Sequence, residues 1–137
     1  MGSDQTTIRF RLEPASGLAP FRQLVDQVRQ AVALGSLVPG DRLPSVREVV
    51  GQVTINPNTV QRAYRELEHE GIIEARPGLG TFVAARAESA VSTSAVNDLL
   101  EALRAWVERA RVAGLDDAGV VALVALALRG EEEVPAR

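Results

Sequence analysis

Residues 55–71 read INPNTVQRAYRELEHEG, and this stretch decides the fold because it carries the signals of an amphipathic helix. Asn56 can cap the free backbone amides of a first turn, and Pro57 suits that turn. The apolar residues that follow recur at i, i+3, i+4 and i+7, which puts them on one stripe: Val60, Ala63, Tyr64 and Leu67. We therefore predict a helix that begins at Asn56, ends at Gly71 and buries one face.

The polar face of this helix lacks the Glu and Lys of an ordinary solvated surface at its start. It carries amide, hydroxyl and guanidinium groups instead: Asn58, Thr59, Gln61, Arg62 and Arg65. In the major groove, Asn and Gln pair with adenine, Arg pairs with guanine, and the Thr methyl packs on the thymine methyl. The residues of the first two turns are therefore predicted to reach bases, and Arg65, one turn further, to meet phosphate.

Two more helices precede this one, and a hairpin follows it. Residues 20–35 have apolar positions at helical spacing, and residues 45–53 begin with the capping-box pattern Ser45-x-x-Glu48. Residues 72–76 and 81–85 read as two strands around the turn PGLG. This order predicts a mostly α, α+β fold, a winged helix-turn-helix whose third helix enters the major groove.

The other segments complete the predicted domain organisation. The alternating residues 6–12 indicate a short strand, so the DNA-binding domain is expected to cover 1–85. Residues 86–94 are small and polar, which is typical of a linker. Residues 95–130 are expected to form an α-helical dimerisation tail, and the acidic 131–137 a flexible end.

The charge balance needs to be considered by region. The chain has no Lys and a formal net charge of −3, which by itself argues against a nucleic-acid binder. Residues 1–85, however, hold nine Arg against nine acidic residues, and residues 42–65 hold four Arg and only Glu48 as an acid. Because local charge governs attraction to phosphates, the composition permits DNA binding.

Several function classes are excluded by what the sequence lacks. It has no Cys and one His, and no nucleophilic triad, carboxylate pair or phosphate-binding loop stands out, so we expect neither an enzyme nor a metal or cofactor site. No apolar segment approaches the ~20 residues that span a bilayer. The N-terminus has no signal-peptide core, and we expect a cytoplasmic protein.

The run LGSLVPGDRLPSVREVVGQVTINPNTVQRAYRELEHEGIIEARPGLGTFV, residues 34–83, closely resembles the GntR family of bacterial transcription regulators. It matches that family's Gly-x-Leu-x-Pro-Gly-Asp-x-Leu-Pro-Ser, Arg-Glu, Thr-Val, Leu-x-x-Glu-Gly and Gly-x-Gly-Thr-Phe-Val spacings. NPNTVQRAY and the short tail are similar to the YtrA-type subfamily, whose members are typically homodimeric repressors.

The resemblance implies DNA contacts at Arg47 in the second helix, at the polar face with Asn56, and at the hairpin near Arg76 and Gly78. Two features depart from the family pattern. Thr54 stands in the turn between the second and third helices and would be strained if that turn needed a positive φ. Gly51 lies inside the second helix, where it costs about 1 kcal/mol relative to Ala.

The tail is too apolar to stand alone. Two helices, about 95–113 and 117–129, are expected, and the second is apolar on nearly every side. A second copy of the tail is the simplest cover, which gives a two-fold dimer. The predicted dimer contacts are Leu99, Leu103, Trp106, Ala110, Val120, Leu123, Val124 and Leu128.

Together these features predict a homodimeric repressor that binds double-stranded DNA at a palindromic, inverted-repeat operator. The alternative is a winged helix that binds protein and has no specific DNA site. The operator sequence, and the existence and chemistry of a small-molecule effector, stay open.

Overall fold

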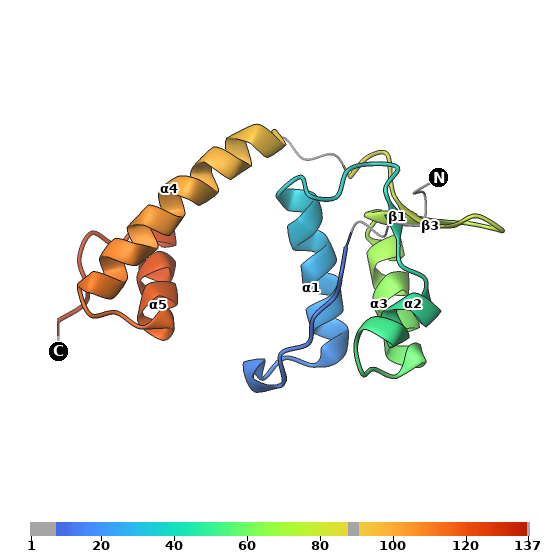
Figure 1. The fold of residues 1–137 in the computed structure, drawn as a ribbon, viewed down its shortest axis with the longest axis horizontal. Helices are drawn as coiled ribbons and strands as arrows, with labels where there is room; N and C mark the ends of the chain where they lie inside the picture. The colour runs from blue at the N-terminus through green and yellow to red at the C-terminus, as the bar shows by residue number, and fades with distance from the viewer. Residues whose placement is uncertain (1–7, 88–90, 137) are drawn as a thin grey trace. The chain divides into compact units, whose positions relative to one another are not determined.

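The structure is a computed structural model that describes residues 8–87 and 91–136. The chain divides into two compact units, Met1–Val96 and Asn97–Arg137 (Figure 1). Each unit has its own helices, and the N-terminal unit also holds the sheet.

The N-terminal unit is built from three helices and a small antiparallel sheet. Helix α1 spans Pro20–Ala33, α2 Val46–Gln52 and α3 Pro57–His69. The strands are β1 (Arg42–Leu43), β2 (Ile73–Arg76) and β3 (Gly80–Val83), in the order β1-β3-β2. Helices α1 and α3 lie side by side, and the β2–β3 hairpin extends away from them as a slender arm (Figure 1). The winged helix-turn-helix prediction is thus confirmed.

One core holds this unit together. It joins the apolar stripes of the three helices to one residue from each strand and to the segment before α1. Its most buried members include Phe10, Leu24, Val25, Val28, Leu37, Leu43, Val49, Val60, Leu67 and Val83. The predicted stripe of α3 is buried in full. This burial fixes which face of α3 remains outside.

The sequence did not reveal strand β1. Its two residues pair with β3 in the register Arg42↔Phe82 and Leu43↔Thr81. The backbone amide of Val83 also donates to the carbonyl of Asp41 at 2.8 Å. Two residues are too few to show a periodic pattern in the sequence. They form a strand only because they pair with the edge of β3.

The strand predicted at 6–12 is wrong for the residues described, since residues 8–13 have no strand partner. Glutamine side chains take the place of a neighbouring strand. Gln52 accepts from the amide of Phe10 at 3.1 Å, and Gln27 both accepts from the amide and donates to the carbonyl of Arg11. Gln23 binds Glu13 in the same two ways. The alternation of this segment reflects one side packed on the core and one side in water.

The turn from α2 to α3 is unstrained. Val53 is extended, with φ −137° and ψ 154°, and no residue other than glycine has a positive φ in the described part of the chain. The condition under which Thr54 would be strained is therefore not met. Gly51 is exposed, and no atom lies within 4 Å of the position that a Cβ would take there. Packing therefore does not explain this glycine.

The C-terminal unit consists of two helices, and the first of them begins four residues before the boundary between the units. Helix α4 spans Thr93–Val112, so it begins inside the range predicted as linker, of which residues 88–90 lie outside the described chain. Helix α5 spans Asp117–Leu128 and is capped by the side chain of Asp116, which accepts from the amide of Gly119 at 2.8 Å. In the described ranges, no helix combines the length and apolar character that crossing a membrane requires.

Candidate nucleic-acid interface

The start of α3 is built as the sequence predicts. The side chain of Asn56 accepts from the amide of Asn58 at 2.8 Å, and Pro57 occupies the first turn. Asn56 is thereby committed to capping, which leaves its amide nitrogen as the group that can meet an outside partner. The buried Tyr64 hydroxyl donates to the carbonyl of Pro44 at 2.5 Å, and burial raises the pKa of this phenol. This bond ties α3 to the start of α2 and fixes the rotation of the helix.

That rotation leaves the polar face outside. The exposed members of the predicted set on α3 are Asn56, Asn58, Gln61, Arg62 and Arg65, and Thr59 is half-buried. Amide and guanidinium groups are therefore available along a strip of more than two turns. This strip could accept the edges of bases.

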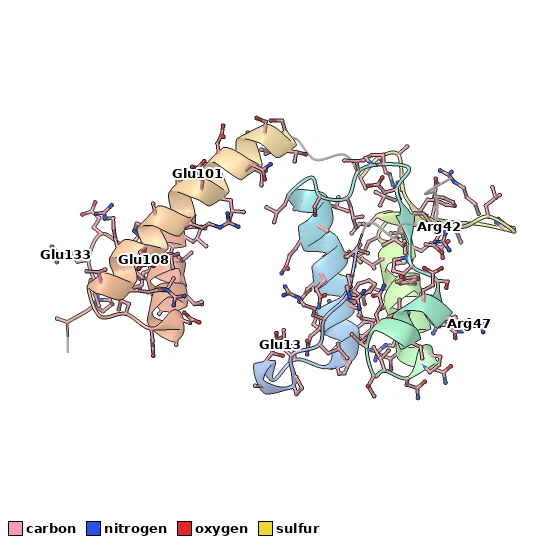
Figure 2. All side chains as sticks on the ribbon, viewed as in Figure 1. Glu13, Arg42, Arg47, Glu101, Glu108 and Glu133 are labelled. Carbon is pink, nitrogen blue, oxygen red and sulfur yellow. The ribbon has the colours of Figure 1, made fainter. Side chains whose placement is uncertain are left out.

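Helix α2 carries another predicted contact, Arg47. The Ser45 hydroxyl accepts from the amide of Glu48 at 3.1 Å, and Arg42 pairs with the Glu48 carboxylate at 2.8 Å. The hydrogen bond from Arg42 holds the pKa of Glu48 below its usual value. Arg47 is exposed and projects from α2 away from α1 (Figure 2).

The hairpin tip is a tight turn of residues 76–79. The amide of Leu79 donates to the carbonyl of Arg76 at 2.9 Å, and Gly78 has φ +76°, as a type II turn with Pro at its second position requires. Nothing lies within 4 Å of the place of a Cβ on Gly78, so the backbone there is open to close approach. Arg76 pairs with Glu74 at 2.7 Å and lies over the ring of Phe82.

Some arginines of the N-terminal unit are paired with carboxylates, and others are not. Arg22 and Arg29 of α1 pair with Glu66 and Glu70 on the C-terminal half of α3, and the hydrogen bond from Arg29 holds the pKa of Glu70 below its usual value. Glu68 accepts from the amide of Ala75. In contrast, Arg47, Arg62 and Arg65 form no ion pair with any carboxylate among residues 8–87 and 91–136.

The predicted residues fall into two neighbourhoods on α3. Gln61, Arg65 and Glu68 line a shallow hollow with Val46 of α2 and with residues of the hairpin, among them Ala75 and Thr81. The face of α3 that carries Gln61 and Arg65 therefore shares one surface with the hairpin.

Arg62 lies on the other flank of α3. Its guanidinium carbon sits 3.9 Å from the centre of the Phe21 ring on α1. Sequence patterns do not indicate a role of Phe21 outside the core, because this residue fits the apolar stripe of its own helix.

In the C-terminal unit, much of the predicted dimer surface is uncovered. Leu99, Leu103 and Leu128 are exposed, Val124 is at the limit of exposure, and Trp106, Val120 and Leu123 are half-buried. Ala110 is buried within the helix pair itself, so it packs within its own unit in this structure.

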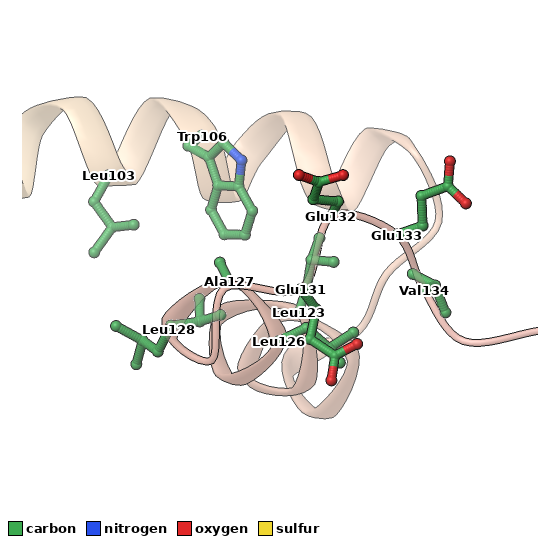
Figure 3. Close-up of a pocket in the computed structure, with 11 residues that line it drawn as sticks. Leu103, Trp106, Leu123, Leu126, Ala127, Leu128, Glu131, Glu132, Glu133 and Val134 are labelled. Carbon is green, nitrogen blue, oxygen red and sulfur yellow. The ribbon is translucent and has the colours of Figure 1, made fainter.

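A hollow of about 460 Å³ is bordered by five residues of this set: Leu103, Trp106, Leu123, Val124 and Leu128. Leu103 and Trp106 point from α4 toward α5, where Ala127 faces the indole (Figure 3). The same close-up shows Glu132 and Glu133 of the C-terminal segment beside this hollow. Among the described residues, no cluster of three or more His, Asp or Glu could hold a metal ion.

The comparisons with known proteins agree with this geometry. The sequence profile described as "Bacterial regulatory proteins, gntR family" matches residues 20–83. The HTH-type transcriptional repressor YtrA of Bacillus subtilis is 36% identical over 107 residues, which cover 78% of this chain and 82% of that protein.

Two solved structures resemble the fold. A structure described as a transcriptional antiterminator from Listeria monocytogenes has a TM-score of 0.57 and 25% identity over 96% of this chain and 99% of that one. YtrA from Sulfolobus acidocaldarius, described as a GntR-family transcription factor, has a TM-score of 0.51 and 30% identity over 77% of this chain and 99% of that one.

Proposed function

The chain belongs to the GntR family of bacterial regulatory proteins and is of the YtrA type, and from this membership we propose that it is a homodimeric, sequence-specific DNA-binding repressor. The relatives it matches are named as regulators, so the chain is a transcription regulator and not an enzyme. Such a protein acts where the chromosome is, in the bacterial cytoplasm.

The observation that carries the proposal is the exposed strip of α3. Asn58 and Gln61 present amides in its first turns, whereas the carboxylates of Glu66 and Glu70 are held by arginines of α1. A helix laid in the major groove with this strip inward would set amides against base edges, while the carboxylates of Glu66 and Glu70 stay paired with arginines of α1. We assign base contacts to Asn58, Thr59 and Gln61 and phosphate contacts to Arg47 and Arg65.

The hairpin would support this docking from the side. It shares a surface with Gln61 and Arg65, and its tip at Gly78 has an open backbone. A major-groove position of α3 would bring this tip to the neighbouring sugar–phosphate strand. Arg76, already fixed over Phe82, would meet a phosphate there.

The apolar tail supports the dimer. Exposed leucines on α4 and α5 border an apolar hollow, and a second tail would remove them from water. A two-fold dimer presents two copies of α3, which fit an inverted repeat with half-sites about 10–10.5 bp apart or a multiple of that. A dimer bound over a promoter would block transcription.

Selection of bound sequences from random duplexes, followed by a salt titration on the winner, tests the proposal with the full chain. We expect an inverted repeat and an affinity that falls steeply with salt. If no sequence is enriched and binding to duplexes is absent, the protein-binding winged helix replaces this proposal.

A further inference from the structure

Arg62 and Phe21 form a stacked pair between two helices that are far apart in sequence. Phe21 is the second residue of α1, and its side chain is 8% exposed. The guanidinium carbon of Arg62 lies 3.9 Å from the ring centre, which is closer than the 5.1 Å of Arg22. A guanidinium at this distance lies in contact with the aromatic face.

The stack decides where Arg62 points. The spacing along α3 makes it a candidate base reader beside Gln61, but the ring of Phe21 holds it toward α1. Gln61 lines the hollow that α3 shares with the hairpin, and Arg62 does not. Arg62 is thus turned to the side of α3 that packs on α1. A side chain on the flank of a helix in the major groove is nearer to the sugar–phosphate strand at the edge of the groove than to the base edges at its floor.

The stack also leaves the chemistry of Arg62 intact. An aromatic contact uses the face of the guanidinium, whereas its N–H donors point outward in the plane, where a phosphate can accept two of them. Arg22 has lost this freedom, because it pairs with Glu66 at 3.3 Å. Arg62 is exposed and has no carboxylate partner among the described residues.

We infer that Arg62 binds a backbone phosphate rather than a base, and that Phe21 is the positioning residue that holds its guanidinium ready. The inference rests on the proposed DNA-binding function. It assigns to α1 a part in DNA binding through the ring of Phe21.

The test measures the binding of Arg62→Ala to the selected operator and to a random duplex over a range of salt. We expect both affinities to fall by the same factor, roughly tenfold, because a phosphate contact is independent of sequence. The slope of log affinity against log salt should fall by about 0.9, the value of one phosphate. A shift of base preference at one operator position with an unchanged slope would overturn the inference.

Phe21→Leu tests the positioning role, since it keeps an apolar side chain and removes the aromatic face. We expect it to weaken binding about two- to five-fold in the wild-type chain and to have no effect in the Arg62→Ala chain. Equal weakening in both chains would mean that Phe21 acts only through the fold. Phe21→Tyr keeps the ring and should restore binding, and thermal unfolding of each variant monitors the core.

Arg22→Ala is the matched control, because this arginine approaches the same ring but is paired with Glu66. Its salt slope should equal that of the wild type, and a loss equal to that of Arg62→Ala would refute the assignment to Arg62. If the wild-type chain shows no salt-dependent duplex binding, the proposed function itself fails. If the wild type binds its operator and only the variant results disagree, the inference alone fails.

Discussion

Truncation of Leu128 to Ala should break the proposed dimer without harming the fold. Leu128 is 83% exposed in the isolated chain, so water already surrounds the atoms that the substitution removes. Ala is at least as good a helix former as Leu, which leaves the stability of α5 unchanged. The substitution is therefore expected to weaken the association of two subunits and to leave the stability of each subunit unchanged.

The size of the effect follows from the exposed fraction. Leu→Ala removes three carbons, each worth about 0.8 kcal/mol when buried. With 83% of the side chain available for burial by a partner, the loss is about 2 kcal/mol per subunit. Two-fold symmetry doubles it to about 4 kcal/mol, which is roughly a thousandfold in the dimer dissociation constant.

Sedimentation equilibrium on the full chain measures this constant. Val112→Ala is the matched control, because Val112 is also 83% exposed but lies outside the predicted dimer contacts. It should leave the constant nearly unchanged. A dimer that tolerates Leu128→Ala, or that weakens as much with Val112→Ala, would refute the assignment of the interface to this apolar surface.

Three other predictions concern the reading face and the charges behind it. Gln61→Ala should cost about 1–3 kcal/mol on the selected operator and relax preference at one base position, as measured by repeated selection with the variant; an unchanged preference would remove Gln61 from the base contacts. Arg65→Ala should weaken all duplexes alike and reduce the salt slope by about one, as measured by fluorescence anisotropy; a loss confined to the operator would contradict a phosphate role. Arg29 lowers the pKa of Glu70, so this pair stabilises the fold above the ordinary carboxyl pKa of 4.5 and loses that contribution as pH falls through the lowered value. Urea unfolding should accordingly show that Arg29→Gln is less stable than the wild type by under about 1 kcal/mol at pH 7, with the difference vanishing in acid.

Helix α3 could be predicted because its signals are local. A capping Asn56, a Pro in the first turn, four apolar residues at helical spacing and a closing Gly71 all act within one segment. Such signals do not depend on the rest of the chain, and the structure reproduces the helix within a residue or two at each end.

The parts that sequence reasoning missed depend on distant partners. Strand β1 exists because β3 offers an edge, and residues 8–13 remain outside the sheet because glutamines of α1 and α2 bind their backbone. The direction of Arg62 likewise depends on Phe21, whose place in the sequence reveals nothing of their contact. A periodicity argument finds which face a residue is on, but it does not find which neighbour will hold it.

The glutamine attachments of the segment before α1 bear on how this protein can be studied. The side chains that hold this segment, those of Gln23, Gln27 and Gln52, carry no charge. Neither added salt nor a moderate change of pH therefore weakens their hydrogen bonds. The proposed binding to DNA, in contrast, weakens as the salt concentration rises. A rising salt gradient on a column of immobilised operator should therefore release the protein in its native form. The salt concentration at which it elutes then measures the strength of DNA binding, because the segment before α1 stays attached.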